Sequence, residues 1–144
     1  MSDPETLVRR IFDAFNQRTF AGVAAEVIGP DFVRHDLMDL LPGVRGQTGA
    51  ADWLTMLTSA LPDSHLEIED IFESNGMVTV RYHLSGAHTG GPLFGLSATG
   101  KPLDLLGINI YRVTEGKIVE TWQTVDGLAI WRAAGRVSDH SLSS

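Results

Sequence analysis

The sequence contains no cysteine, so the chain can form neither a disulfide bond nor a thiolate metal site. No two of its histidines have the close spacing typical of metal ligands on a helix or strand. No apolar run approaches the length that crosses a bilayer, and the polar, acidic start Met-Ser-Asp-Pro-Glu does not resemble a signal peptide. We therefore expect no metal and no membrane contact, and we expect a cytoplasmic location.

Basic residues are few and stand singly along the chain. The sequence has 11 Lys and Arg against 18 Asp and Glu, which gives a formal net charge of −7. A chain of this charge is not attracted to nucleic acid or to an anionic membrane surface. No glycine-rich loop leads from a strand into a helix, so we expect no nucleotide and no other cofactor.

The 144 residues are 43% hydrophobic, which is enough for one domain with a real core. Helical periodicity predicts helices over residues 4–18, 20–28 and 49–61, with Gly29-Pro30 ending the second. Residues 31–36 should be short and partly extended, and residues 37–48 should form a loop. We expect residues 1–136 to form the domain and 137–144 a flexible tail.

The second half of the sequence alternates with a period of two. This pattern predicts strands over residues 66–73, 77–89, 102–113 and 118–125, with a tight turn at Asn75-Gly76. The four glycines of residues 90–101 suit a mobile lid, and 126–134 should be a short terminal helix. Helices followed by antiparallel hairpins indicate an α+β fold. A sheet of long strands curls under its own twist and can enclose an apolar pocket for a hydrophobic small molecule.

The strand predicted over residues 102–113 is apolar on both faces. Leu103, Leu105, Gly107 and Asn109 share one face, and the opposite face is also largely apolar. Helices can cover one face, and a second copy of the chain could cover the other. We therefore predict a homodimer through the sheet.

Several motifs follow one another along the chain, among them residues 59–66 (Ser-Ala-Leu-Pro-Asp-Ser-His-Leu), 85–90 (Ser-Gly-Ala-His-Thr-Gly) and 98–101 (Ala-Thr-Gly-Lys). They resemble segments of the SnoaL-like polyketide cyclases of the NTF2-like superfamily, with Ala98 in place of a proline. Residues 32–36 and the stretch from Tyr111 through Trp122 to Asp126 match an early and a C-terminal signature. The resemblance implies an NTF2-like cone, in which a curved antiparallel sheet packs against about three N-terminal helices.

The chain departs from the family pattern at two positions. The resemblance aligns the catalytic carboxylate of the aldol cyclases with Gln123 and the histidine that assists it with Asn109. Val119, Thr121 and Gln123 share one face of a strand, and Asn109 should face the same cavity. An amide cannot abstract a proton near neutral pH, but it can donate and accept hydrogen bonds. Gln123 and Asn109 could thus clamp a substrate carbonyl, or simply satisfy each other in the core.

Two titratable residues are further catalytic candidates. His35 lies near the expected pocket mouth, where it could act as acid or base or merely bond to the backbone. Asp104 could be a base if it faces inward. Simple alternation places it on the other face of the strand from Asn109, and only a β-bulge would turn it to the inward face.

Candidate substrate-binding residues are Trp53, Tyr82, His88, Leu105 and Thr121. Trp53 and Tyr82 could form an aromatic wall for a flat ligand, but either could equally be a core residue. For His88 the simpler interpretation is that it anchors the following loop to the neighbouring strand.

These features favour a cofactor-independent cyclase of a polyketide intermediate, in which the pocket shapes the substrate for a pericyclic or Diels–Alder-like closure. Two alternatives stay open. One is an acid–base isomerase, dehydratase or hydroxylase of the same fold that uses Asp104 or His35. The other is a non-catalytic protein that binds a small molecule.

Overall fold

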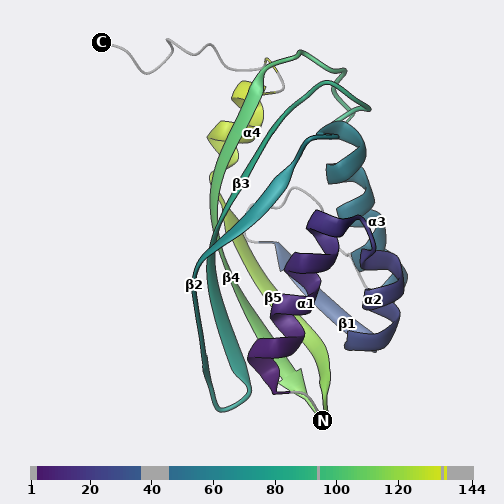
Figure 1. Cartoon of the computed structure of the whole chain (residues 1–144), viewed down its shortest axis with the longest axis vertical. Coiled ribbons are helices and arrows are strands. Elements are labelled where there is room, and N and C mark those ends of the chain that lie inside the picture. The colour runs from purple at the N-terminus through teal and green to yellow at the C-terminus, as the bar shows by residue number, and fades with distance from the viewer. Residues whose placement is uncertain (1–2, 37–45, 94, 134, 136–144) are drawn as a thin grey trace.

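Three helices cover the concave face of a five-stranded sheet in a computed structural model of the chain, which describes residues 3–36, 46–93, 95–133 and 135 (Figure 1). The helices of this layer are α1 (Pro4–Gln17), α2 (Phe20–Val27) and α3 (Gly46–Ala60). The strands are β1 (Ile28–Asp36), β2 (His65–Ser74), β3 (Met77–Ala87), β4 (Pro102–Thr114) and β5 (Lys117–Val125), in the spatial order β1-β5-β4-β3-β2. A short helix α4 (Gly127–Ala133) follows the last strand. The predicted α+β fold is confirmed.

The edge strand β1 is longer than the sequence indicated. It begins at Ile28, directly after α2, and therefore includes Gly29 and Pro30. An edge strand tolerates proline because one of its sides needs no N–H donor. β1 pairs with β5 in parallel, whereas every other pairing in the sheet is antiparallel.

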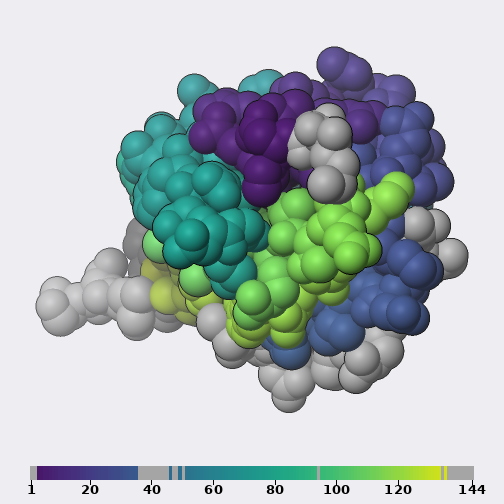
Figure 2. All heavy atoms as spheres, turned by 90° about the horizontal axis from the view of Figure 1, so that it is seen from below, coloured from purple at the N-terminus to yellow at the C-terminus, as the bar shows by residue number. Residues whose placement is uncertain are grey.

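The long strand β4 alternates as predicted. Its buried residues are Leu103, Leu105, Gly107, Asn109 and Tyr111, and the residues between them are mostly exposed. The turn before β3 is also confirmed, since Asn75 and Gly76 have φ angles of 52° and 78°. Figure 2 shows this hairpin turn beside the turn between β4 and β5 at the end of the molecule where α1 begins.

Strand β5 contains a β-bulge that the sequence did not reveal. Arg112 pairs with Glu120 and Val113 with Ile118, so Val119 has no partner of its own. The extra residue reverses the alternation, and Ile118 rather than Val119 joins the buried face that carries Thr121 and Gln123. The prediction that Val119 shares this face is wrong for that reason.

Two other boundaries differ from the predictions. Helix α3 begins at Gly46, three residues before the expected position, and Gly46 itself has a φ of 70°, which glycine adopts without strain. The predicted loop residues 37–45 and the tail 137–144 lie outside the described residues. No helix in the described ranges is long and apolar enough to cross a membrane.

Helix α1 is capped at its start and hydrogen-bonded to the sheet near its end. Asp3 caps its start by accepting a hydrogen bond of 3.1 Å from the Thr6 backbone N–H, and the apolar face of the helix, including Phe12 and Phe15, is buried. Near its end, Asn16 Nδ2 donates to the Leu66 carbonyl and Asn16 Oδ1 accepts from the Leu66 N–H, both at 2.8 Å. The amide thus occupies the free edge of β2 as another strand would.

Replacing Asn16 by alanine should destabilise the fold by about 1–3 kcal/mol, because both backbone groups of Leu66 lose their partner. The neighbouring exposed residue Gln17 offers a control, and Gln17→Ala should change the free energy of unfolding by no more than about 0.5 kcal/mol. Urea unfolding monitored by circular dichroism measures both. Equal stability of the two variants would contradict the fastening role of Asn16.

Candidate active site in the cone

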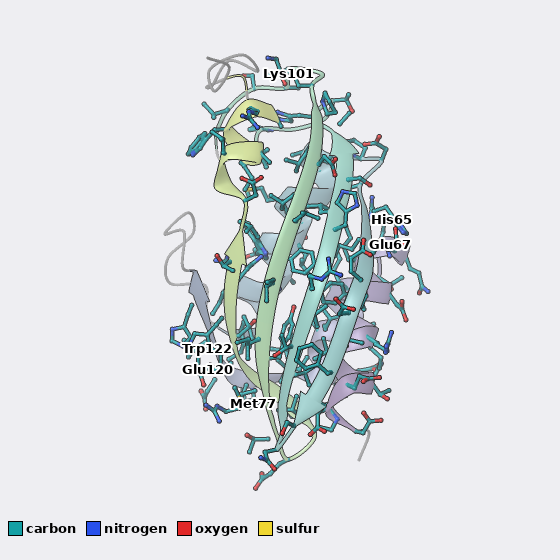
Figure 3. The ribbon with its side chains drawn as sticks, turned by 90° about the vertical axis from the view of Figure 1, so that its left-hand side faces the viewer. His65, Glu67, Met77, Lys101, Glu120 and Trp122 are labelled. Atoms are coloured by element: carbon teal, nitrogen blue, oxygen red, sulfur yellow. The ribbon has the colours of Figure 1, made fainter. Side chains whose placement is uncertain are left out.

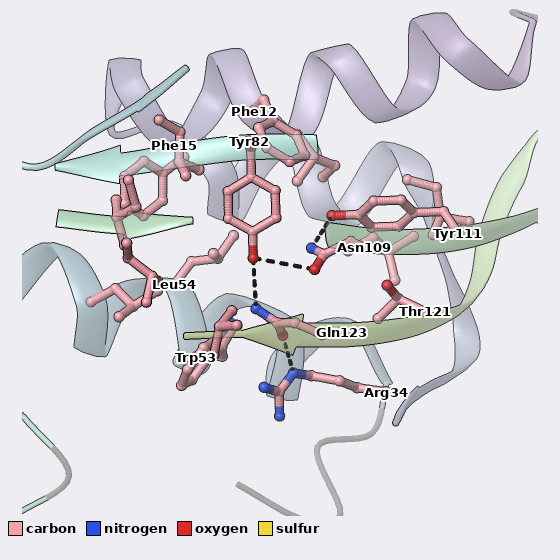
Figure 4. A pocket seen from close by; sticks show the side chains of 18 of the residues that line it. Phe12, Phe15, Arg34, Trp53, Leu54, Tyr82, Asn109, Tyr111, Thr121 and Gln123 are labelled. Atoms are coloured by element: carbon pink, nitrogen blue, oxygen red, sulfur yellow. Dashed lines mark hydrogen bonds between the residues drawn. The ribbon is translucent and has the colours of Figure 1, made fainter. Parts of the chain in front are cut away.

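A pocket lies between the helices and the concave face of the sheet (Figure 4). Most of its lining is apolar, with side chains such as Phe12, Phe15, Leu54, Leu84 and Leu105. The polar lining groups come from β1, β3, β4 and β5 and gather on one side, as Figure 4 shows. An apolar cavity with a few convergent polar groups is typical of a small-molecule site.

Asn109 and Gln123 face each other directly across β4 and β5. Both line the pocket and both are buried, with 7% and 8% of their surface exposed, which confirms that they share one cavity. The two amides are joined through Tyr82. The Tyr82 hydroxyl donates to Asn109 Oδ1 at 3.2 Å, and Gln123 Nε2 donates to the Tyr82 oxygen at 3.4 Å.

Arg34 is a pocket residue that the sequence analysis missed. Its Nε donates to Gln123 Oε1 at 2.8 Å, and its Cζ lies 4.4 Å from the centroid of the Trp53 ring. A buried guanidinium is costly unless hydrogen bonds and an aromatic face compensate for lost water, and both are present here. The available signal was the alternation Phe32-x-Arg34, which places a cation on the same side as a core phenylalanine.

Tyr111 is the second pocket residue that was missed. Its oxygen accepts a hydrogen bond of 2.9 Å from Asn109 Nδ2. Burial raises the pKa of the Tyr111 phenol well above its ordinary value of 10.0, so the group stays protonated. The alternation of β4 could have revealed it, because Tyr111 follows Asn109 on the inward face.

Four of the five predicted substrate-binding residues line the pocket, namely Trp53, Tyr82, Leu105 and Thr121. The Thr121 hydroxyl donates to the Ile110 carbonyl at 3.0 Å, so its proton is engaged within the sheet. Trp53 and Tyr82 provide aromatic surface in the pocket, as predicted.

Asp104 lies outside the pocket, contrary to its proposed role as a base. No bulge interrupts β4 at this position, so the side chain alternates onto the outer face, where 78% of it is exposed and it contacts His83. A carboxylate in this position is solvated and cannot reach a ligand in the cone.

His35 also points away from the pocket, which corrects its placement at the mouth. Its Nε2 lies 2.7 Å from Glu120 Oε2, and its ring stacks on Trp122 at 5.2 Å between centroids. Figure 3 shows Glu120 and Trp122 side by side near the lower end of the sheet's outer face. The hydrogen bond with His35, together with one from Arg112, lowers the pKa of Glu120. This cluster joins β1, β4 and β5 from outside.

His88 is fully buried but does not line the pocket, so its assignment to substrate binding is corrected. Its Nε2 donates to the Gly91 carbonyl at 2.9 Å, and its backbone bonds to Lys101 and Gly100. These bonds anchor the segment 90–101, and Leu93 from this segment is buried against the pocket. Whether the segment opens as a lid stays a prediction.

Comparison with known proteins agrees with this architecture. The family model described as SnoaL-like polyketide cyclase matches residues 5–134. The chain belongs to the SnoaL-like polyketide cyclase family. Aklanonic acid methyl ester cyclase DnrD of Streptomyces peucetius is 31% identical over 136 residues, which cover 94% of this chain and 92% of the relative. The corresponding cyclase DauD of Streptomyces sp. (strain C5) is 33% identical over 137 residues, which cover 94% of this chain and 83% of the relative.

The fold of the family is also found in solved structures. The crystal structure of a SnoaL-like protein from Jannaschia sp. CCS1 aligns with a TM-score of 0.82 and 24% sequence identity, over 96% of this chain and 98% of the other. At this identity the comparison establishes the NTF2-like fold that the sequence predicted.

In this SnoaL-like pocket, no described lining residue is Asp, Glu, His or Lys. The charged and polar lining side chains are a guanidinium, two amides and hydroxyl groups, together with the indole of Trp53. Such a set can orient a ligand and donate hydrogen bonds, but it holds no group that exchanges protons readily near neutral pH. The described residues also contain no group of three potential metal ligands, and the expected lack of a metal stays a prediction.

Gly107 allows the Tyr82 ring to lie flat across β4, where it bridges Asn109 and Gln123. Gly107 and Tyr82 are cross-strand partners, and a Cβ at Gly107 would lie 2.4 Å from Tyr82 Cζ and 2.5 Å from its oxygen. Any side chain at Gly107 would therefore push the ring out of its place.

Gly107→Ala should destabilise the protein by about 1–3 kcal/mol through overpacking and should break the hydrogen bonds of the Tyr82 hydroxyl. Gly22→Ala is the matched control, because a Cβ there meets nothing within 4 Å and alanine should stabilise α2 by about 0.5–1 kcal/mol. Urea unfolding and the near-ultraviolet circular dichroism of the tyrosines report the two effects. A Gly107→Ala variant as stable as Gly22→Ala would show that the ring is not held in this way.

Proposed function

We propose that this protein closes a carbon ring in a polyketide intermediate without a cofactor. The observation that carries the proposal is the apolar pocket of a SnoaL-like domain whose polar groups converge on one side. The pocket would fold a flexible, hydrophobic substrate so that its reacting carbons meet. Orientation of this kind can remove roughly 7–11 kcal/mol from a reaction barrier in favourable cases.

The polar side of the pocket would add electrostatic stabilisation. A substrate carbonyl placed there gains negative charge on its oxygen as the new bond forms, and preorganised donors stabilise that charge strongly in a water-poor site. The amide nitrogens of Asn109 and Gln123 each donate one proton within the pocket, to Tyr111 and Tyr82, and their second protons would join this donor set, where the resemblance to aldol cyclases had implied His and Asp. A pericyclic closure suits the site, because it rearranges bonds without a proton transfer and therefore needs no base.

The acid–base alternative has lost its candidate groups, since Asp104 and His35 both lie on the outer face. The alternative of a non-catalytic binding protein is distinguished from a cyclase by turnover. The names of DnrD and DauD supply a substrate to test first, aklanonic acid methyl ester.

Purified protein should convert aklanonic acid methyl ester, or another open polyketide in a panel around it, into a cyclised product detected by chromatography and mass spectrometry. Gln123→Leu and Asn109→Leu should each lower kcat by at least about tenfold, because each removes part of the donor set. Thr114→Ala is the control, since Thr114 is exposed at the end of β4, lines neither the pocket nor the outer groove, and should leave the rate unchanged.

The rate should be nearly constant from about pH 5 to pH 8, because no described pocket residue titrates in that range. A profile governed by one group with a histidine-like pKa would favour the acid–base alternative instead. Tight binding of the ester with no product from any member of the panel would favour the non-catalytic alternative.

A homodimer through the sheet is part of the same proposal, as is a cytoplasmic location. The outer face exposes Phe72, Leu106 and Ile108 by 61%, 59% and 44%. Leu106 and Ile108 line a shallow groove on this face together with Gly107 and Val125. An apolar face of this kind is commonly covered by a partner.

Multi-angle light scattering at micromolar concentration should give the mass of a dimer, and Leu106→Arg should shift it to the monomer because the new charge would be buried at the interface. Asp13→Arg places the same charge on the exposed side of α1 and should leave the dimer intact. A monomeric wild-type protein would overturn this part of the proposal.

A further inference from the structure

The hydrogen bonds of the pocket form a chain that runs in one direction (Figure 4). A guanidinium only donates, so the Gln123 atom that faces Arg34 Nε must be its oxygen. The Gln123 amide nitrogen then faces Tyr82 and donates to it, and the Tyr82 proton passes to Asn109 Oδ1. The Asn109 nitrogen donates in turn to the Tyr111 oxygen. Every bond therefore points from Arg34 toward Tyr111.

The proton of the last group in this chain has no acceptor in the described part of the protein. Three hydroxyl groups line the pocket, on Tyr82, Thr121 and Tyr111. The first donates to Asn109 and the second to the Ile110 carbonyl, so both protons are engaged. Tyr111 accepts from Asn109, and no acceptor for its own proton is found among the described residues.

The surroundings of Tyr111 favour donation of its hydroxyl proton to a ligand in the pocket. The side chain is 8% exposed and lines the pocket, so water does not compete strongly for it. Burial keeps the phenol protonated at any physiological pH. Each donor in the chain polarises the next one, and the charge of Arg34 stands at its start, so the final O–H is a stronger donor than an isolated tyrosine.

We propose that the Tyr111 hydroxyl donates a hydrogen bond to a ketone oxygen of the ligand, and that this ketone lies in a planar, apolar, conjugated part of the molecule. The inference rests on the proposed cyclase function for the identity of that ketone as the substrate, but the site itself needs no turnover to bind one. The mostly apolar lining includes the rings of Phe12, Phe15 and Tyr82 and so suits a flat ring system, whose carbonyl completes the chain that begins at Arg34. The hydrogen bond from Tyr111 becomes stronger as the ketone oxygen gains negative charge, and no proton is transferred.

The test uses 9-fluorenone labelled with ¹³C at its carbonyl, a flat apolar ketone whose C=O stretch is read by infrared difference spectroscopy. Bound to the wild-type protein, the stretch should lie below its value in hydrocarbon solvent. Tyr111→Phe should return it toward that value and weaken binding roughly three- to tenfold, as expected for the loss of one hydrogen bond. Tyr82→Phe removes the same atom from the same pocket and should leave most of the displacement in place.

The comparison of the two variants decides the direction of the chain. A stretch that responds to Tyr82→Phe and not to Tyr111→Phe would mean that the Asn109 amide is reversed and that Tyr82 is the donor, which overturns the proposal. An unchanged stretch in both variants would also overturn it.

A second substitution at position 111 keeps the phenol and tests the proposal even if Tyr111→Phe fails to fold. 3-Fluorotyrosine introduced at position 111 is a more acidic phenol, so it should lower the fluorenone stretch further than wild type does. No response to this substitution would overturn the proposal. Failure of the cyclase assay alongside a displaced, Tyr111-dependent stretch would contradict the proposed reaction and leave the hydrogen-bond donor established.

Discussion

The arrangement of the pocket depends on one buried cation whose hydrogen-bonding atoms are all donors. Arg34 enters the cone from the edge strand β1, and its guanidinium can only donate. Its presence fixes which end of the Gln123 amide faces it, and each further group in turn inherits its orientation from the one before. An isolated amide or hydroxyl can act as donor or acceptor toward either neighbour. A row of such groups therefore has no preferred direction of hydrogen bonding unless a group that only donates stands at one end. The cation supplies that direction, and Trp53 covers its face.

Local patterns in the sequence predicted most of the fold. The alternation of β4 predicted that Asn109 faces inward, and Asn75-Gly76 predicted the turn of the first hairpin. The apolar face and the Asp3 cap predicted helix α1. Two features depended on contacts between distant segments. The parallel pairing of β1 with β5 brings together residues about 90 positions apart, and the bulge at Val119 becomes visible only against the partner strand. Neither leaves a periodic signal.

The candidate site was predicted in part for the same reason. Asn109 and Gln123 were found because the resemblance aligns them with the catalytic pair of the aldol cyclases and strand alternation turns them toward one cavity, and Tyr82 was found as an aromatic residue of a strand. Arg34 was missed because a single cation in a short edge segment looks like a solvated side chain until the helix layer is seen to bury it. His35 and Asp104 were selected for their chemistry, yet strand parity turns both outward, where Glu120 and His83 satisfy them. Chemical type therefore identified fewer site residues than the face of the strand did.

Gly107 has a consequence for the wall of the cone. On the inner side the Tyr82 ring lies directly on its backbone, and on the outer side the same residue forms part of the groove between Leu106 and Ile108. Because Gly107 has no side chain, the wall between the pocket and the groove consists here of the strand backbone alone. Only the backbone of this strand separates the Tyr82 ring on the inner side from the groove on the outer side. A side chain at Gly107 would therefore alter both surfaces of the sheet at once.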